Sequence, residues 1–294
     1  MKNEEKDFRM VATTMFGLEE ILTAELLKLG ARDIEKFNRA VSFTGDSGFM
    51  YKANFCLRTA LRVLKPIANF QADDSTHLYK QIKKIEWEKY LSENGTLAVD
   101  AAVNSETFTH SQFVSQRVKD AVCDRFREIA NDVRPSVDLD FPDVRINIHI
   151  VKNTCTVSLD SSGYSLHKRG YRDSTGIAPM NEVLAAGLVL LSGWDKSKTL
   201  VDPMCGSGTI AFEAAMMAAN IPPGYYREKF GFEKWKDFDA ELFEIIREKI
   251  IDKITDYPAS VLLPIYRPII LRKQNKIQNS PRLTIWLNSL LPIF

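Results

Sequence analysis

The sequence lacks the features that define several large classes of protein. Its 294 residues contain four cysteines and four histidines, all scattered along the chain, and no Cys-x-x-Cys pair. A disulfide framework or a metal site is therefore not expected, and reduced thiols suit a cytoplasmic protein. No run approaches about 18 apolar residues, and the charged N-terminus lacks an apolar core. Neither a membrane span nor a secretion signal is expected.

An excess of charge of either sign is also missing. The chain has 39 Lys+Arg and 38 Asp+Glu, which gives a net charge of +1. Any anionic partner must therefore be bound by a local patch rather than by the overall field. Hydrophobic residues make up 45% of the chain and charged residues 26%, which is typical of a globular protein. The length suits two or three domains.

Residue patterns in the first 160 positions predict an α+β arrangement. The expected strands cover 8–14, 41–43, 61–70 and 97–103, and the expected helices are 17–30, 50–57 and two that begin at Ser75 and Ser111. Apolar residues alternate strictly over 144–150 and again over 155–159, which predicts a hairpin with one buried face. This region can bury a core of its own, so we expect it to fold without the rest of the chain.

The second half shows a different pattern. An apolar helix is expected over Met180–Leu191, a short buried strand over Thr199–Val201 and an Ala-rich helix over Ile210–Ala219. A Gly-rich turn, 202–209, joins this strand to the second helix. Such an order is typical of the opening of a doubly wound α/β domain.

The Gly-rich turn is the strongest functional signal. Gly206 and Gly208 allow a tight turn and a close backbone approach to a ligand, and the following helix offers N–H groups to an anion. Asp202, at the end of the strand, can meet the amino group of S-adenosylmethionine while the loop amides meet its carboxylate. The same turn formally satisfies the dinucleotide pattern G-x-G-x-x-A, and a turn without any ligand is the third interpretation. The acid at the strand end favours S-adenosylmethionine.

Basic side chains form two candidate contacts for nucleic acid. Lys168, Arg169 and Arg172 surround Tyr171, a combination that suits phosphate contact and base stacking. Arg117 and Lys119 lie on the outer faces of the helix that begins at Ser111. The alternative for both groups is an ordinary solvated surface.

Three segments together resemble the bacterial THUMP-domain RNA methyltransferases, in the group that methylates guanine N2 of large-subunit ribosomal RNA. The segments are 108–114 (Phe-Thr-His-Ser-Gln-Phe-Val), 165–172 (Ser-Leu-His-Lys-Arg-Gly-Tyr-Arg) and 201–210 (Val-Asp-Pro-Met-Cys-Gly-Ser-Gly-Thr-Ile). The resemblance extends over about residues 1–260.

The resemblance implies a fold, a cofactor and a partner. A ferredoxin-like subdomain is expected over 1–57, an RNA-binding THUMP domain over 58–159, and an incomplete Rossmann-like methyltransferase domain over 160–294. S-adenosylmethionine is the implied cofactor and structured ribosomal RNA the implied partner, with neither metal nor membrane. The residues implied to bind the cofactor are Asp202, Pro203, Cys205, Gly206, Ser207, Gly208 and Thr209.

The sequence also departs from the family. Its members orient the guanine amine with an Asn-Pro-Pro-Tyr loop, which these 294 residues do not contain, so no catalytic residue is assigned. No acid follows the expected second strand, 259–263, to hold the ribose hydroxyls. Residues 261–294 contain no Asp, Glu, Gly or Ala, and we interpret this tail as the product of a frameshift near residue 261.

These departures lead to two hypotheses for the function. The chain is either an RNA methyltransferase or an RNA-binding THUMP protein with an inactive methyltransferase half. We expect this polypeptide alone to transfer no methyl group, and the residues from about 180 onward to be loosely packed.

Overall fold

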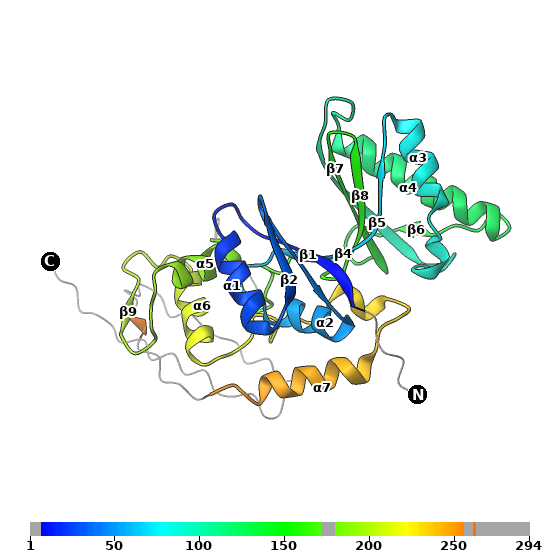
Figure 1. Ribbon diagram of the computed structural model, residues 1–294. Helices are drawn as coiled ribbons and strands as arrows, with labels where there is room; N and C mark the ends of the chain where they lie inside the picture. Colours follow the sequence, from blue (N-terminus) through cyan, green and yellow to red (C-terminus); the bar gives the residue numbers. More distant parts are fainter. Residues whose placement is uncertain (1–6, 172–179, 256–260, 263–294) are drawn as a thin grey trace.

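The first part of the computed structural model is an antiparallel sheet with two helices, and the description covers residues 7–171, 180–255 and 261–262 (Figure 1). Its elements are β1 (Phe8–Thr13), α1 (Glu19–Leu29), β2 (Arg32–Phe37), β3 (Ala40–Gly45), α2 (Ser47–Cys56) and β4 (Arg62–Gln71). Helix α1 ends at Gly30, as expected, and Asp46 caps α2 by accepting a hydrogen bond from the Phe49 N–H. Strand β2 was not expected from the sequence.

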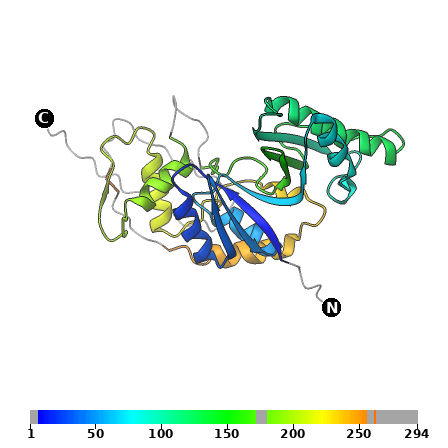
Figure 2. The same ribbon diagram turned by 45° about the horizontal axis from the view of Figure 1, so that its top comes forward.

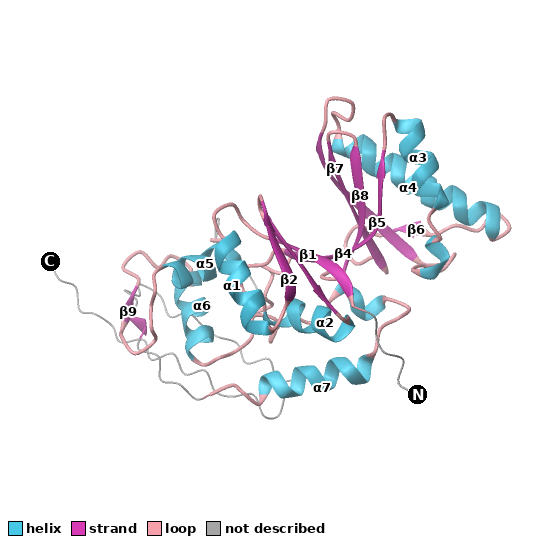
Figure 3. Cartoon of the chain, viewed as in Figure 1, coloured by secondary structure: helices cyan, strands magenta, loops and turns pink. Residues whose placement is uncertain are grey.

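Strand β4 joins this part to a second α+β part. Its first residues pair with β1 and the rest pairs with β8, with a shift of register between Pro66 and Ala68. One sheet of eight strands results, in the order β2-β3-β1-β4-β8-β7-β5-β6, which Figure 3 shows in magenta. The boundary predicted near residue 57 therefore lies just before a strand that both parts share.

The second part carries its helices on one face of the sheet. Its further elements are α3 (Ser75–Lys84), η1 (Trp87–Lys89), β5 (Thr96–Asn104), α4 (Ser111–Ile129), β6 (Ser136–Val137), β7 (Val144–Val151) and β8 (Thr154–Asp160). Strands β7 and β8 form the predicted hairpin, and Ile146, Ile148 and Ile150 are buried on its inner face. Strand β5 pairs with β7 in parallel.

The third part begins an α/β domain. Helix α5 (Glu182–Leu191) packs on α6 (Thr209–Ala218), and strand β9 (Leu200–Val201) pairs in parallel with β10 (Val261–Leu262). Both views place α5 and α6 beside α1, at the end of the molecule away from α3 and α4 (Figures 1 and 2). The predicted fold class, an α+β region followed by an α/β methyltransferase-like region, is confirmed.

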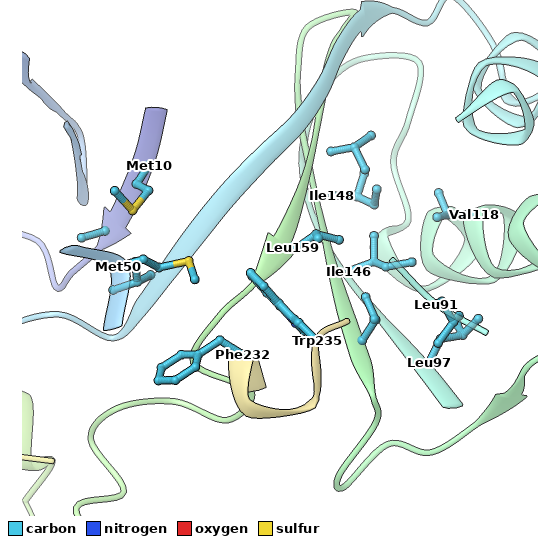
Figure 4. Close-up of a cluster of buried hydrophobic side chains, with 14 of the residues drawn as sticks. Met10, Met50, Leu91, Leu97, Val118, Ile146, Ile148, Leu159, Phe232 and Trp235 are labelled. Atoms are coloured by element: carbon cyan, nitrogen blue, oxygen red, sulfur yellow. The ribbon is translucent and has the colours of Figure 1, made fainter. Parts of the chain in front are cut away.

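The segment that follows α6 departs from the expectation. It contains η2 (Gly231–Lys234) and α7 (Ala240–Ile251), and α7 packs against α2 of the first part. Phe230, Phe232, Trp235 and Phe243 are buried in the same core as the strands of the first 160 residues. Figure 4 shows Trp235 between Met50 on one side and Ile146 and Leu159 on the other. Loose packing after residue 180 is therefore wrong for this segment, and residues 1–160 do not complete their own core.

Candidate functional site

The Gly-rich loop lies between β9 and α6, as the sequence predicts. Gly206 and Gly208 have φ angles of 51° and 74°, in the left-handed region that favours glycine. The Gly208 N–H donates to the Cys205 carbonyl at 2.6 Å, which closes the turn directly before Thr209 begins α6. Gly208 has no side chain to cap this helix, so the first N–H groups of α6 can face a ligand.

Asp202 is held at the start of this loop. Its Oδ1 accepts a hydrogen bond from the Met204 N–H at 3.2 Å, and its side chain is half-buried. Among the described residues, no hydrogen bond occupies its Oδ2. A carboxylate in this position can receive a cationic amino group while the backbone amides receive an anionic group. The loop is open to such a ligand, because Pro203, Met204, Gly206 and Ser207 are exposed.

The remaining loop residues are small and uncharged. Burial, together with the negative charge of Asp202, raises the pKa of the Cys205 thiol. A protonated thiol is a poor nucleophile, which agrees with a packing role for Cys205. The hydroxyls of Ser207 and Thr209 lie 3.3 Å apart, and Thr209 is buried at the start of α6.

Arg169 corrects the expectation for the basic segment 168–172. Its side chain is only 2% exposed. The guanidinium donates to the carbonyl oxygens of Leu166 and Arg58 and lies 3.4 Å from the carboxylate of Glu213 on α6. The buried guanidinium therefore ties α6 to the segment between α2 and β4, and it does not lie on the surface where an RNA phosphate would bind.

The other predicted RNA contacts that the structure describes in this segment, Lys168 and Tyr171, differ in how far they are available to a partner. Lys168 is exposed, as an RNA contact requires. The ring of Tyr171 stacks on Phe212 with centroids 5.2 Å apart, and its hydroxyl donates to Glu213 at 3.2 Å. One face of this ring is thus already covered by the protein. Arg172, the fourth predicted contact, lies outside the described residues.

The two candidates on α4 have partners of their own. The Arg117 guanidinium lies 4.3 Å from the ring centroid of Tyr79, and Lys119 pairs with Asp120 at 2.6 Å. These contacts are typical of an ordinary helix surface, so RNA contact by Arg117 and Lys119 stays a prediction. In the part of the chain that the structure describes, no cluster of His, Cys, Asp and Glu could hold a metal, and no helix could cross a membrane.

Sequence reasoning missed the two charged residues, Glu213 and Arg58, that hold this region together. Glu213 is completely buried within the apolar-rich helix α6, and Arg58 donates from the end of α2 to the Ile221 carbonyl at 2.5 Å. In the sequence both residues resemble ordinary surface charges. Their partners are more than 40 positions away, so no local pattern indicates the pairing. The one signal that could have indicated burial is that both residues have apolar neighbours in the sequence.

Three protein families match successive parts of the chain. The RlmL ferredoxin-like domain matches residues 9–64, the THUMP domain 72–160 and the RMKL-like methyltransferase domain 169–284. The last match includes most of the tail from residue 261. The frameshift therefore stays a hypothesis, which the gene sequence would test.

Curated relatives agree with these matches. The "Ribosomal RNA large subunit methyltransferase K/L" of Syntrophotalea carbinolica is 44% identical over 245 residues, which are 82% of this chain and 34% of the relative. The protein of the same name from Magnetococcus marinus is 41% identical over 84% of this chain and 35% of its own length. The chain thus spans about a third of the length of these two relatives.

Solved structures define the class of protein. A structure described as a "predicted N6-adenine-specific DNA methylase" from Listeria monocytogenes has a TM-score of 0.77 and 33% identity, and it aligns over 88% of this chain and 67% of its own. A "putative methyltransferase complexed with SAH" has a TM-score of 0.75 and 31% identity, over 88% and 68% of the two chains. Fold and loop together define a methyltransferase-like domain joined to a THUMP domain. The chain belongs to the THUMP-domain RNA methyltransferase family.

Proposed function

We propose that this chain provides the RNA-binding and cofactor-binding parts of an S-adenosylmethionine-dependent methyltransferase that acts on guanine N2 of large-subunit ribosomal RNA. The observation that carries the proposal is the Asp202–Thr209 loop, which lies between a parallel strand and a buried helix in a chain that also has a THUMP domain. A ribosomal RNA substrate also favours a cytoplasmic location.

The loop suits S-adenosylmethionine for three reasons. Asp202 offers a carboxylate to the cationic amino group of the methionine part. The turn at Gly206 and Gly208 leaves backbone amides and the start of α6 for its carboxylate. The neutral Cys205 thiol adds no second negative charge beside Asp202. When bound, the cofactor supplies the activated methyl group.

An RNA-binding protein with an inactive methyltransferase part is the second candidate. It is favoured by the sequence itself, because the 294 residues contain no Asn-Pro-Pro-Tyr. In the family that this chain resembles, this loop accepts the hydrogens of the guanine amine, so that its lone pair points at the methyl group. The binding parts are common to both candidates, and only the transfer step separates them.

Methyl transfer by the purified chain is the experiment that separates the candidates. We expect unmodified ribosomal RNA to be bound but not labelled by S-adenosylmethionine with a radioactive methyl group, because these 294 residues lack the Asn-Pro-Pro-Tyr loop that orients the amine in the family that this chain resembles. Digestion to nucleosides identifies any product. N2-methylguanosine would show that other residues orient the amine, and N6-methyladenosine would contradict the proposed guanine specificity.

A further inference from the structure

Two aromatic rings and three lysines meet where the THUMP part joins the methyltransferase part. We call this set the junction patch; its members are Phe141, Tyr164, Lys168, Lys229 and Lys234. Phe141 lies in the loop before β7, and Tyr164 and Lys168 follow β8. Lys229 precedes η2, and Lys234 is its last residue. Three distant stretches of sequence therefore contribute to one surface.

The rings and the cations lie close together. The centroids of Phe141 and Tyr164 are 6.1 Å apart. The amino groups of Lys229 and Lys234 lie 5.4 and 4.8 Å from the centroid of Phe141, and that of Lys168 lies 6.0 Å from Tyr164. All three lysines are exposed, and both rings are half-buried.

The positive charge of the patch is only partly neutralised. Lys234 lies 3.3 Å from Asp143 and donates to the Phe141 carbonyl at 2.6 Å, so it mainly fixes the loop that carries Phe141. Within the described residues, neither Lys168 nor Lys229 takes part in an ion pair. These two amino groups are the ones that an anionic partner can recruit.

Arg227 holds the patch together from beneath. Its guanidinium donates to five backbone carbonyl oxygens, those of Ser162, Tyr164, Ser165, Lys168 and Lys229. It also lies 3.5 Å from the ring centroid of Tyr164. Burial lowers the pKa of Arg227 to about 10, so the group stays charged at neutral pH. One side chain thereby positions both the segment with Tyr164 and Lys168 and the turn with Lys229.

The segment that follows β8 and the turn before η2 are also in close backbone contact, at Gly163 and Gly231. A Cβ atom on Gly163 would lie 2.9 Å from the Gly231 nitrogen, and Gly163 has a φ angle of 78°. The Phe232 N–H donates to the Ser161 carbonyl at 2.9 Å beside this crossing. The patch is therefore formed before any partner binds, and little entropy is lost in ordering it.

We propose that the junction patch binds single-stranded RNA next to a structured region, with phosphates on Lys168 and Lys229 and an unpaired base on the ring of Phe141. Ammonium groups beside an aromatic ring suit single-stranded RNA, because phosphates attract the cations and every base can stack on the ring. An acidic peptide would use the lysines but not the ring. The inference rests on the proposed RNA partner and specifies the surface that binds it.

The first test removes the charges of Lys168 and Lys229. We expect the double variant Lys168→Ala/Lys229→Ala to reduce the slope of log affinity against log salt by about 1.4 to 1.8 for a hairpin RNA with a single-stranded tail. Fluorescence anisotropy over a range of salt concentrations measures this slope. Lys28→Ala/Lys249→Ala is the matched control, since it removes two exposed lysines from α1 and α7 and should leave the slope unchanged.

The second test removes the stacking surface without removing the packing. Phe141→Leu should weaken binding of the tailed hairpin roughly 5- to 150-fold, and binding of a blunt duplex much less. Thermal unfolding of each variant checks that the fold is retained.

The possible outcomes separate this inference from the proposed function. If the wild-type chain binds no RNA, both fail. If it binds RNA and all variants bind equally, only the junction patch is wrong. If polyglutamate binds with the same dependence on the lysines and on Phe141, the surface belongs to a protein partner and the inference is overturned.

Discussion

Phe232→Ala is expected to lower the free energy of unfolding of the whole chain by about 3–5 kcal/mol. Phe232 is 1% exposed and lies among four other rings. Its centroid is 4.5 Å from Tyr51, 5.1 Å from Phe243, 5.3 Å from Phe230 and 5.7 Å from Phe238. Since Tyr51 belongs to α2, the cavity would open in the core of the first part, although position 232 follows the cofactor loop in the sequence.

Urea unfolding measures this effect, and Phe37→Ala is the control. Phe37 is 50% exposed at the end of β2, so its removal should change the free energy of unfolding by less than about 0.5 kcal/mol. Similar small effects of both substitutions would mean that the segment 221–251 is not part of the main core.

Arg169→Met is expected to destabilise the chain by about 3–5 kcal/mol, the usual result of removing one partner from a buried ion pair. The Glu213 carboxylate is completely buried, and after the substitution it keeps the hydrogen bond from the Tyr171 hydroxyl at 3.2 Å but loses its cationic partner. It also frees the carbonyl oxygens of Leu166 and Arg58. Adding Glu213→Gln should recover part of the loss, because the unpaired charge is then gone.

The same variants distinguish a tether from an RNA contact. If Arg169 bound phosphates, Arg169→Met would weaken RNA binding without changing the free energy of unfolding. Urea unfolding measures the stability of each variant, and fluorescence anisotropy measures its affinity for RNA. A tether predicts a loss of stability, whereas an RNA contact predicts a loss of affinity alone. Unchanged stability with weakened RNA binding would restore the original prediction for Arg169.

Local patterns predicted the elements whose partners are near in sequence. The alternation over 144–159 was sufficient for the β7–β8 hairpin, and the loop 202–209 could be placed because strand, turn and helix follow one another. Strand β2 was missed because its residues are mostly exposed and show no alternating burial, since it lies at the edge of the sheet.

The burial of Arg169 and the position of the aromatic residues 230–243 depend on contacts between distant parts of the chain, which the sequence does not show. The charged run at 168–172 suggests a solvated surface, yet Arg169 is buried because Glu213 and the Arg58 carbonyl receive it. In the same way, the aromatic residues of 230–243 show no regular period, and only the fold brings them onto α2. The junction patch joins residues up to 93 positions apart, which no local pattern reveals.

Titration of S-adenosylhomocysteine into the full chain tests the central claim most directly, with NAD as the competing ligand of the dinucleotide interpretation. The account predicts binding of S-adenosylhomocysteine but not of NAD, and about 10- to 150-fold weaker binding by Asp202→Ala, because a charge-assisted hydrogen bond contributes about 1.5–3 kcal/mol. Asp195→Ala is the control, since Asp195 lies in the turn before β9, where its carboxylate accepts hydrogen bonds from the N–H and the hydroxyl of Ser197. Equal binding by wild type and Asp202→Ala, or binding of NAD instead, would contradict the assignment of this loop to the methyl donor.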